Sequence, residues 1–242
     1  VEKVFLNYIE KLDAVSQLEI CGMYHEQESE GQNGIGRRPV DVLHVFGRTR
    51  GTPHIYYYRR RIASDGETVY WTPWEKVDMD IEGNHLIPVV WNRRLYLFWP
   101  VFTEKTRKGE KQGEEAAKYW EIQMAWSEYR NERWSARKVS DDFIQLDPTG
   151  QQFMASKENT KYLTFRSTII RNELYLLCYC SMVYCLNLSE IRGGFRYTRC
   201  NNKMYSIGVG EIVRKIIWKY LPKCISIYAP THSFFKYLTF EQ

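Results

Sequence analysis

Five arginines cluster on one predicted β-hairpin, and their chemistry is the first feature of the sequence that suggests a function. They are Arg48, Arg50, Arg59, Arg60 and Arg61. Guanidinium groups bind carboxylates through paired hydrogen bonds, so such a group could clamp an acidic ligand. Strand alternation places Arg59 and Arg61 on one face and Arg60 on the other. Catalysis on an acidic sugar would also need a nucleophile and a general acid, which the spacing does not identify; we therefore predict no catalytic residue and interpret the arginines as a solvated or ion-paired strand edge.

Aromatic residues are the second group that could bind a ligand. Seven of the eight tryptophans lie between Trp71 and Trp134, and tyrosines are frequent in the same region. Exposed rings could form a platform for sugars, because aromatic faces pack against sugar C–H groups. A single alternating strand cannot expose all its rings, however, and aromatic side chains commonly fill the space between sheets. We interpret most of these residues as core and keep sugar binding as the alternative.

The six cysteines show no metal-binding pattern. Cys178 and Cys180 have the spacing that puts both side chains on one face of a strand, where they would pack as small apolar groups. A zinc site would need C-x-x-C or paired Cys and His residues, and His232 is the only histidine in this part of the sequence. The sequence also contains no phosphate-binding, dinucleotide-binding or nucleic-acid-binding motif. We predict free thiols, with no metal, no cofactor and no nucleic-acid partner.

The composition indicates a folded protein of substantial size. The chain has 242 residues, of which 44% are hydrophobic and 26% are charged. These values exclude a disordered chain, and no uncharged apolar stretch reaches the length of about 18 residues that a membrane-spanning helix needs. The net charge of +5 is concentrated in residues 180–242, which contain nine Lys/Arg and three Asp/Glu. Because the sequence begins with Val1, we interpret the chain as part of a longer protein.

Hydrophobic periodicity predicts one helix followed by many strands. Apolar residues at spacings of three and four predict a helix over residues 1–22, and a polar loop follows at 26–38. The period then changes to two. Strands are predicted at 40–45, 54–62, 68–81, 86–91, 95–102, 119–126, 133–139, 162–170 and 174–184. We expect an exposed charged loop at 104–118 and no definite element after residue 189, where 208–219 fits a strand or a helix.

Two sequence elements recur along the chain. Residues 71–77 resemble residues 134–139, and residues 90–98 resemble residues 170–177. Repeated antiparallel sheets of about four strands are typical of propeller blades, but two or three such units do not close a ring. We therefore predict a mainly β fold of antiparallel, sialidase-like or propeller-like blades that form a partial ring, preceded by a short N-terminal helix.

Two predicted turns are loosely similar to the Asp-box hairpins of sialidase propellers. One runs from Ser64 to Trp71, and the other from Ser127 to Trp134. In such hairpins the turn residues close the loop while the tryptophan anchors it between blades. The expected role of these residues is therefore structural.

Several linked motifs, taken in order, resemble one known family. They are Phe5–Leu12, Leu18–Tyr24, Phe46–Arg50, Tyr56–Arg59, Trp71–Val77, Pro88–Val90, Arg94–Trp99, Trp126–Tyr129 and Trp134–Ser135. Together they resemble the neuraminidase-like region of the A subunits of bacterial insecticidal toxin complexes (Tc toxins). The agreement covers residues 5–145 and becomes weaker toward residue 180.

The resemblance implies a secreted, homopentameric, pore-forming toxin subunit with a helical shell around a translocation channel. Its neuraminidase-like region would close the shell around the channel tip until a pH change opens an electrostatic lock. The channel would then enter the host membrane, and a cocoon of B and C subunits would deliver a toxic enzyme. No catalytic residue of a glycosidase is matched, so we expect a noncatalytic structural and gating domain.

The resemblance also divides the chain into three parts. Residues 1–22 would end the preceding helical shell, residues 23–180 would form the neuraminidase-like β domain, and residues 181–242 would be a divergent or truncated continuation. The expected partners are other protomers, the shell and channel of the same subunit, the B–C cocoon through other regions, and the host membrane through the channel. The alternative function is a glycan-binding β module used in attachment to host cells.

An electrostatic lock would need opposed charges whose balance changes with pH. The acidic candidates are Glu26, Glu28 and Glu30, and the arginine hairpin could oppose them. The histidines that could titrate are His25, His44, His54 and His85. Ordinary surface charge explains the same residues equally well at this stage.

Overall fold

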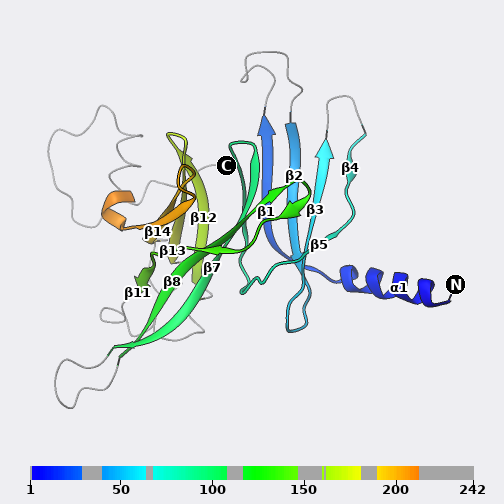
Figure 1. Ribbon diagram of the computed structural model, residues 1–242, viewed down its shortest axis with the longest axis horizontal. Coiled ribbons are helices and arrows are strands. Elements are labelled where there is room, and N and C mark those ends of the chain that lie inside the picture. Colours follow the sequence, from blue (N-terminus) through cyan, green and yellow to red (C-terminus); the bar gives the residue numbers. More distant parts are fainter. Residues whose placement is uncertain are drawn as a thin grey trace. The chain divides into compact units, whose positions relative to one another are not determined.

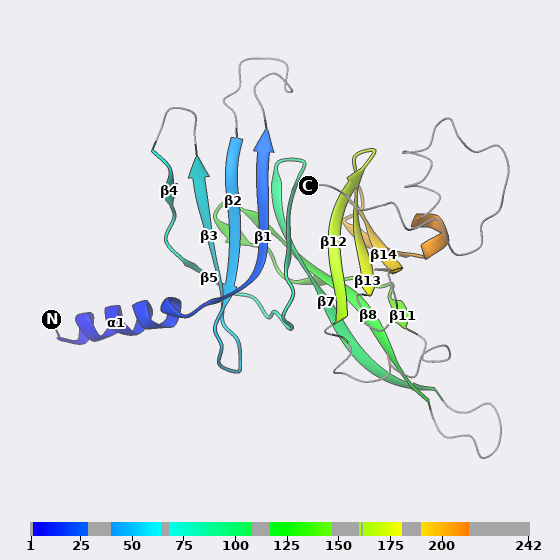
Figure 2. The same ribbon diagram turned by 180° about the vertical axis from the view of Figure 1, so that it is seen from behind.

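The protein is mainly β. The computed structural model describes residues 2–28, 40–63, 68–107, 117–146, 160, 162–180 and 190–212 (Figure 1). Within them, an N-terminal helix is followed by strands that form three antiparallel sheets (Figure 2). The predicted fold class is therefore confirmed. No helix in the described part of the chain is long and apolar enough to cross a membrane.

Two compact units make up the chain. The first contains residues 1–100 and 125–138, and the second contains residues 101–124 and 139–242. Each unit has its own buried apolar residues, such as Phe46 in the first and Phe195 in the second. Arg48, His54, His44 and Arg59, which are discussed below, belong to the first unit.

Helix α1 spans Glu2–Ser16 and is shorter than predicted. The expected last turn is wrong, because Glu19–Glu28 forms strand β1 instead. Strand β1 pairs antiparallel with β2 (Val40–Arg48), so sheet pairing satisfies its backbone groups and overrides the helical spacing. The predicted loop at 26–38 is also wrong at its start, since Glu26 to Glu28 belong to β1; residues 29–39 lie outside the described residues.

The first sheet has the strand order β1-β2-β3-β4, with β5 also paired to β3. Strand β3 spans Tyr56–Ala63, β4 spans Tyr70–Trp71 and β5 spans Glu75–Val77. The sequence predicted one strand over 68–81, with Pro73 causing a bulge or an edge. Because proline lacks a backbone donor, the chain is interrupted around Pro73 and forms two short strands along β3.

Aromatic rings form the core on one face of the first sheet. Phe46 and Tyr58 are opposite each other in the register of β2 and β3, and their ring centroids are 4.7 Å apart. Trp134 contacts both rings, at 5.7 Å from Phe46 and 5.9 Å from Tyr58. This contact supports the expectation that Trp134 anchors its hairpin, whereas Ser64 of the other predicted turn lies outside the described residues.

The second sheet is built on a long hairpin. Strands β7 (Arg94–Arg107) and β8 (Ala117–Arg130) lie in the order β10-β8-β7-β6. The short strands at its sides are β6 (Ile87–Trp91), β9 (Arg133–Trp134), β10 (Lys138–Val139) and β11 (Ile144–Leu146). The predicted loop at 104–118 is therefore wrong at both ends, which belong to the strands, and residues 108–116 lie outside the described residues.

The third sheet contains four strands in sequence order, β12-β13-β14-β15. They are β12 (Leu163–Ile170), β13 (Glu173–Cys180), β14 (Glu190–Thr198) and β15 (Lys203–Ile207). The last two strands fall where the sequence predicted no definite element. Two adjacent glycines in β14 interrupt the apolar alternation that marks a strand in a sequence. Gly193 has φ 142°, and Gly194 lies close to the carbonyl oxygen of Leu176, so the backbone favours glycine at both positions.

Three hairpins share one turn geometry. Positive φ angles occur at both central residues of Asn92–Arg93, Asn131–Glu132 and Arg171–Asn172. Two consecutive left-handed residues define the type I′ turn, whose twist fits an antiparallel hairpin. The first and third of these turns lie in the segments 90–98 and 170–177, so the predicted repeat corresponds to two equivalent hairpins.

Candidate functional site

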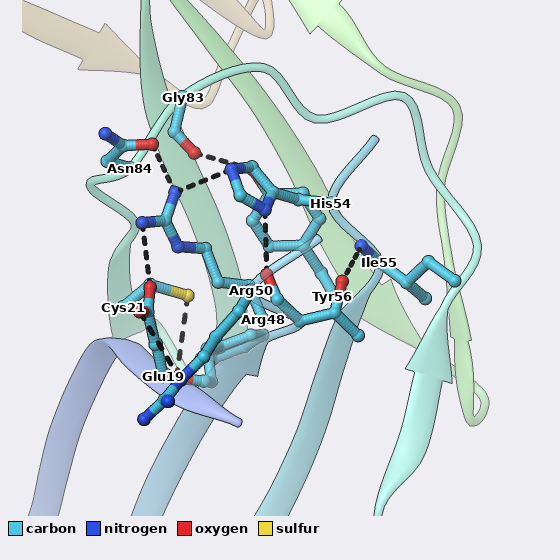
Figure 3. Close-up of polar contacts among 11 residues, drawn as sticks. Glu19, Cys21, Arg48, Arg50, His54, Ile55, Tyr56, Gly83 and Asn84 are labelled. Carbon is cyan, nitrogen blue, oxygen red and sulfur yellow. Dashed lines mark hydrogen bonds and ion pairs between the residues drawn. The ribbon is translucent and has the colours of Figure 1, made fainter. Parts of the chain in front are cut away.

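Arg48, the last residue of β2, lies at the centre of a polar cluster in the first unit (Figure 3). Its Nη2 donates to Glu19 Oε2 over 3.0 Å, and its Nη1 lies 3.2 Å from His54 Nε2 and also donates to Asn84 Oδ1. The Arg48 side chain is only 14% exposed, whereas Glu19 is 43% exposed and the contact with Asn84 lies at the surface. Arg48 therefore connects the start of β1, the loop before β3 and the loop that precedes β6.

The contacts of His54 assign different hydrogen-bond roles to its two ring nitrogens. Its Nδ1 lies 2.7 Å from the carbonyl oxygen of Thr49, which can only accept, so Nδ1 carries the proton. Its Nε2 faces Arg48, which can only donate, so Nε2 must be unprotonated. In this geometry Nε2 faces Arg48 as an acceptor, and a proton on Nε2 would place two cations against each other.

Strand register positions these groups. Arg48 is opposite Glu19 in β1 and opposite Tyr56 in β3. The Tyr56 hydroxyl donates to the carbonyl oxygen of Gly83 over 2.6 Å, which holds the loop with Asn84 against the sheet. Arg50 lies farther out, 3.8 Å from Glu19 and 68% exposed. Burial raises the pKa of Tyr56, so its hydroxyl keeps its proton and remains a donor.

Cys21 lies beside this cluster, on β1. Its thiol donates to the carbonyl oxygen of Phe46 over 3.6 Å. Burial raises the pKa of the thiol to about 12, although the positive charge of Arg48 acts in the opposite direction. The thiolate is the reactive form, so Cys21 is an inert, packed thiol at neutral pH.

A second histidine of the first sheet is buried in a different environment. His44 Nδ1 lies 2.7 Å from the Tyr58 hydroxyl, and its Nε2 lies 3.3 Å from Glu26 Oε2. Both neighbours can accept a proton from the ring, so this site accommodates neutral and charged imidazole alike. Burial strongly raises the pKa of Tyr58. The structure thus brings Glu26 to His44 and leaves His54 with the arginine.

The other lock candidates are more exposed or less informative. His25 Nε2 lies 2.8 Å from Asp41 Oδ1, and both side chains are largely exposed. His85 is half-buried. Nothing is described of the Glu28 side chain, and Glu30 lies outside the described residues.

The prediction for the arginines was a solvated or ion-paired strand edge, and of these two the ion pairing is found, within the described structure, at Arg48 and Arg50 but not at the remaining three. The Arg59 guanidinium carbon lies 4.1 Å from the ring centroid of Trp71 and 4.4 Å from that of Trp74. Among described residues, Arg59, Arg60 and Arg61 form no salt bridge, unlike Arg48 and Arg50. Arg60 lies on the opposite face, where its charge acts on Tyr58 and Tyr129. Cation–π stacking therefore replaces ion pairing at Arg59.

Four of the seven tryptophans in the described part of the chain lie in the core, which agrees with the expectation that these rings mainly fill the core. Trp91, Trp99, Trp120 and Trp126 are each no more than 5% exposed, whereas Trp71 is 43% exposed.

No group of three His, Cys, Asp or Glu residues in the described ranges is arranged to hold a metal ion. Cys21, Cys178 and Cys200 are free thiols, while Cys180 lies in β13 with no described side chain.

Sequence reasoning missed two partners of Arg48. Glu19 was assigned to a helix and Asn84 to a turn, although both contact the same guanidinium. Glu19 lies close to Arg48 because of the register between β1 and β2. Asn84 lies close to Arg48 because the loop after β5 passes this end of the sheet.

Comparison with protein families identifies the domain type. The model of the neuraminidase-like domain matches residues 18–182. The chain belongs to this family. The resemblance to the neuraminidase-like region of Tc toxin A subunits, inferred from the motifs, is thereby confirmed. The matched range contains the polar cluster around Arg48 and the aromatic core of the first sheet.

Solved structures contain a similar fold. The neuraminidase-like domain aligns with TcdA4 of Morganella morganii, solved by cryo-EM, with a TM-score of 0.53 and 14% identity over 88% of this chain. It also aligns with TcaA–TcaB of Yersinia pseudotuberculosis at 16% identity over 60% of this chain, but the TM-score of 0.39 is too low to carry an argument. The chain spans 9% of the TcdA4 chain and 7% of the TcaA–TcaB chain. Comparison with curated proteins gave no match.

Proposed function

We propose that this neuraminidase-like domain is a noncatalytic structural and gating element of a secreted, pore-forming Tc toxin A subunit. In this role it closes the helical shell around the channel until acidification opens it, so that the channel can insert into the host membrane. The family match and the fold shared with TcdA4 support a toxin-complex domain. The observation that carries the gating role is the contact between Arg48 and His54 Nε2.

The proposed assembly is a homopentamer. The end of the preceding helical shell lies in residues 1–22, of which α1 spans Glu2–Ser16, the gating domain comprises residues 23–180 together with the start of strand β1, and residues 181–242 continue it. The exposed apolar residues of α1 are consistent with a helix that packs against further helices of the shell. The shell, the channel and neighbouring protomers are direct partners, and the B–C cocoon binds other regions of the subunit.

Acid acts on the cluster through His54. Histidine side chains change charge between about pH 5 and 8. Protonation at Nε2 replaces a hydrogen-bond acceptor with a cation that faces Arg48. The charge around Arg48 cannot offset this cation, because Arg50 lies nearby and Glu19 is the one acidic partner among the described residues. The contact is then lost, and with it one connection between the sheet and the loop that contains Asn84. By contrast, a proton on His25 strengthens its contact with Asp41, and His44 retains both partners.

A substitution of His54 by glutamine tests this role. The glutamine carbonyl can accept from Arg48 but cannot gain a proton in this range. The free energy of unfolding of the chain is measured from about pH 8 to about pH 5. We expect the wild type to lose more stability than H54Q on acidification, while the control H25Q, which lacks the contact with Asp41, should lose at least as much as the wild type. An equal loss in H54Q and wild type would exclude His54 as the acid-sensitive group.

The gating role is tested separately in the full-length subunit. Dye release from liposomes reports channel insertion, and H54Q should require a lower pH than wild type or H25Q. Insertion of H54Q at the wild-type pH, despite the stability effect, would reject the role in gating.

The absence of catalysis is tested with a fluorogenic sialoside across about pH 4 to 8. Turnover that disappears on substitution of the arginines would identify an enzyme instead.

A further inference from the structure

The face of the first sheet that contains Arg59 is chemically distinct from the aromatic core on the other face. Strand alternation puts Arg59 and Arg61 on this face, and Arg61 is directly opposite Trp71 in the register of β3 and β4. Trp71 and Trp74 lie close to the Arg59 guanidinium. Two cations and two aromatic rings therefore lie together within the first unit.

Arg59 lacks the partner that its chemistry calls for. Its Nε is buried without a hydrogen-bond partner, and its guanidinium forms no ion pair with a described residue. A planar guanidinium is the group best suited to bind a carboxylate through two parallel hydrogen bonds. The two indole rings contact the guanidinium without using its terminal donors, so the Nη groups keep their capacity to bind an acceptor.

The charges around Arg59 favour an anion. Asp41 is the carboxylate on the same face among the described residues of β2 to β5, and it is bound to His25 at 2.8 Å. Glu75 points to the opposite face, where it accepts from the Tyr129 hydroxyl over 3.1 Å. Lys76 is opposite Tyr57 and adds a third positive charge to the face of Arg59. No described acidic side chain therefore neutralises Arg59 or Arg61.

The exposed ring of Trp71 indicates what accompanies the anion. Trp71 is 43% exposed although it stacks on Arg59. An exposed indole next to cationic donors suits a ligand with an apolar C–H face beside a carboxylate, because aromatic faces pack against such surfaces. A sugar acid has an apolar C–H face and a carboxylate within one ring. Its small size matches a site built around one pair of opposite residues, Arg61 and Trp71.

We infer that Arg59, Arg61, Trp71 and Trp74 form a binding site for a carboxylate-bearing sugar. The carboxylate receives hydrogen bonds from the arginine Nη groups, and the sugar ring stacks on the exposed face of Trp71. This site lies on the opposite face of β3 from Tyr58 and uses none of the residues of the Arg48 cluster. It goes beyond gating, and neither proposal depends on the other.

Neighbouring residues provide matched controls for this site. Arg60 and Tyr70 are adjacent to Arg59 and Trp71 in sequence but point to the other face of the sheet. Variants R59Q and W71A remove the proposed contacts, whereas R60Q and Y70A remove equivalent groups outside the site. R61Q is a further test, because Arg61 forms no described ion pair or ring stacking that the fold would lose.

The experiment is titration of the chain with 3′-sialyllactose and with glucuronic acid, followed by saturation-transfer NMR and tryptophan fluorescence, with lactose as the neutral control. We expect saturable binding of the acidic sugars that weakens about tenfold in R59Q, R61Q and W71A and is unchanged in R60Q and Y70A. Circular dichroism establishes that each variant is folded, and R61Q provides the result if R59Q unfolds.

Three outcomes would overturn the inference. One is no saturable binding of either acidic sugar by the folded wild-type chain. Another is equal binding of lactose, or equal loss in the control variants. The third is tighter binding of an acidic peptide such as a glutamate hexamer that is lost in R59Q, which would assign the face to a protein partner instead.

Discussion

His44 Nδ1 and the Tyr58 hydroxyl oxygen lie 2.7 Å apart in the buried part of the first sheet. The two residues come from neighbouring strands, β2 and β3, and their rings are nearly parallel, with 5° between the planes. Tyr58 also contacts Phe46, Trp134 and Tyr129. One hydroxyl thus satisfies a buried histidine while its ring fills the aromatic core.

Substitution of Tyr58 by phenylalanine should separate these two roles. The ring contacts remain, but His44 Nδ1 loses its hydrogen-bond partner in a buried position. We expect Y58F to lower the free energy of unfolding by about 1–3 kcal/mol, measured by urea denaturation at neutral pH. The control is Y24F, which removes a longer contact of 3.4 Å to the carbonyl oxygen of Val90. A loss in Y24F as large as that in Y58F would contradict the special importance of the His44 contact.

Gly22 in β1 should not tolerate a side chain. A Cβ at this position would lie 2.8 Å from the carbonyl oxygen of Leu86 and 3.1 Å from Cδ of Pro88. The backbone of Leu86 is held in place, because its N–H donates to the carbonyl oxygen of Cys21. The Leu86 carbonyl oxygen therefore cannot move away from position 22 without loss of this hydrogen bond. We expect G22A to cost about 1–3 kcal/mol of unfolding free energy.

The control for this glycine is Gly51, where a Cβ would meet no atom within 4 Å. G51A should therefore unfold at the same urea concentration as the wild type. Similar destabilisation in both variants would show that the close approach of β1 to Leu86 does not explain the requirement for glycine at position 22.

Local sequence signals predicted the strands and hairpins of this domain well where the apolar alternation was regular. The segment at 86–91 and the hairpin turn at Asn92–Arg93 are examples, because alternation and turn residues act over a few neighbours. The error at Glu19–Glu28 has the opposite cause. Its apolar residues also fit helical spacing, and only the pairing with β2 decides between the two structures.

The candidate site was less predictable than the fold. Four histidines and five arginines were identified from sequence, but their partners were not, since contacts such as Arg48 with Asn84 join residues far apart in the chain. The arginine hairpin shows the same limit. Strand alternation separated Arg60 from Arg59 correctly, whereas stacking of Arg59 on Trp74 depends on how the chain passes Pro73.

Replacement of Glu132 by glycine should stabilise the protein. Glu132 has φ 60° in the turn between β8 and β9, a conformation that costs a residue with a Cβ about 1 kcal/mol relative to glycine. E132G would also create the Asn-Gly pair that type I′ turns prefer. We expect an increase of about 0.5–1 kcal/mol in unfolding free energy. The neighbouring R133G, in strand β9, should instead destabilise; stabilisation by both or by neither would contradict the turn argument.

Alkaline pH should destabilise the first unit through groups that are protonated and buried. Burial raises the pKa of Cys21 from 9.0 to about 12, and burial with the nearby Glu75 raises the pKa of Tyr129 from 10.0 to about 12. The unfolded chain loses these protons at lower pH than the folded one, so the unfolded state gains stability as the pH rises. The contribution of both groups to stability is complete below about pH 9 and is lost progressively up to about pH 12. The free energy of unfolding, measured by urea denaturation at several pH values in this range, should decline less for C21A and Y129F than for the wild type. If the decline in both variants equals that of the wild type, Cys21 and Tyr129 are not its cause.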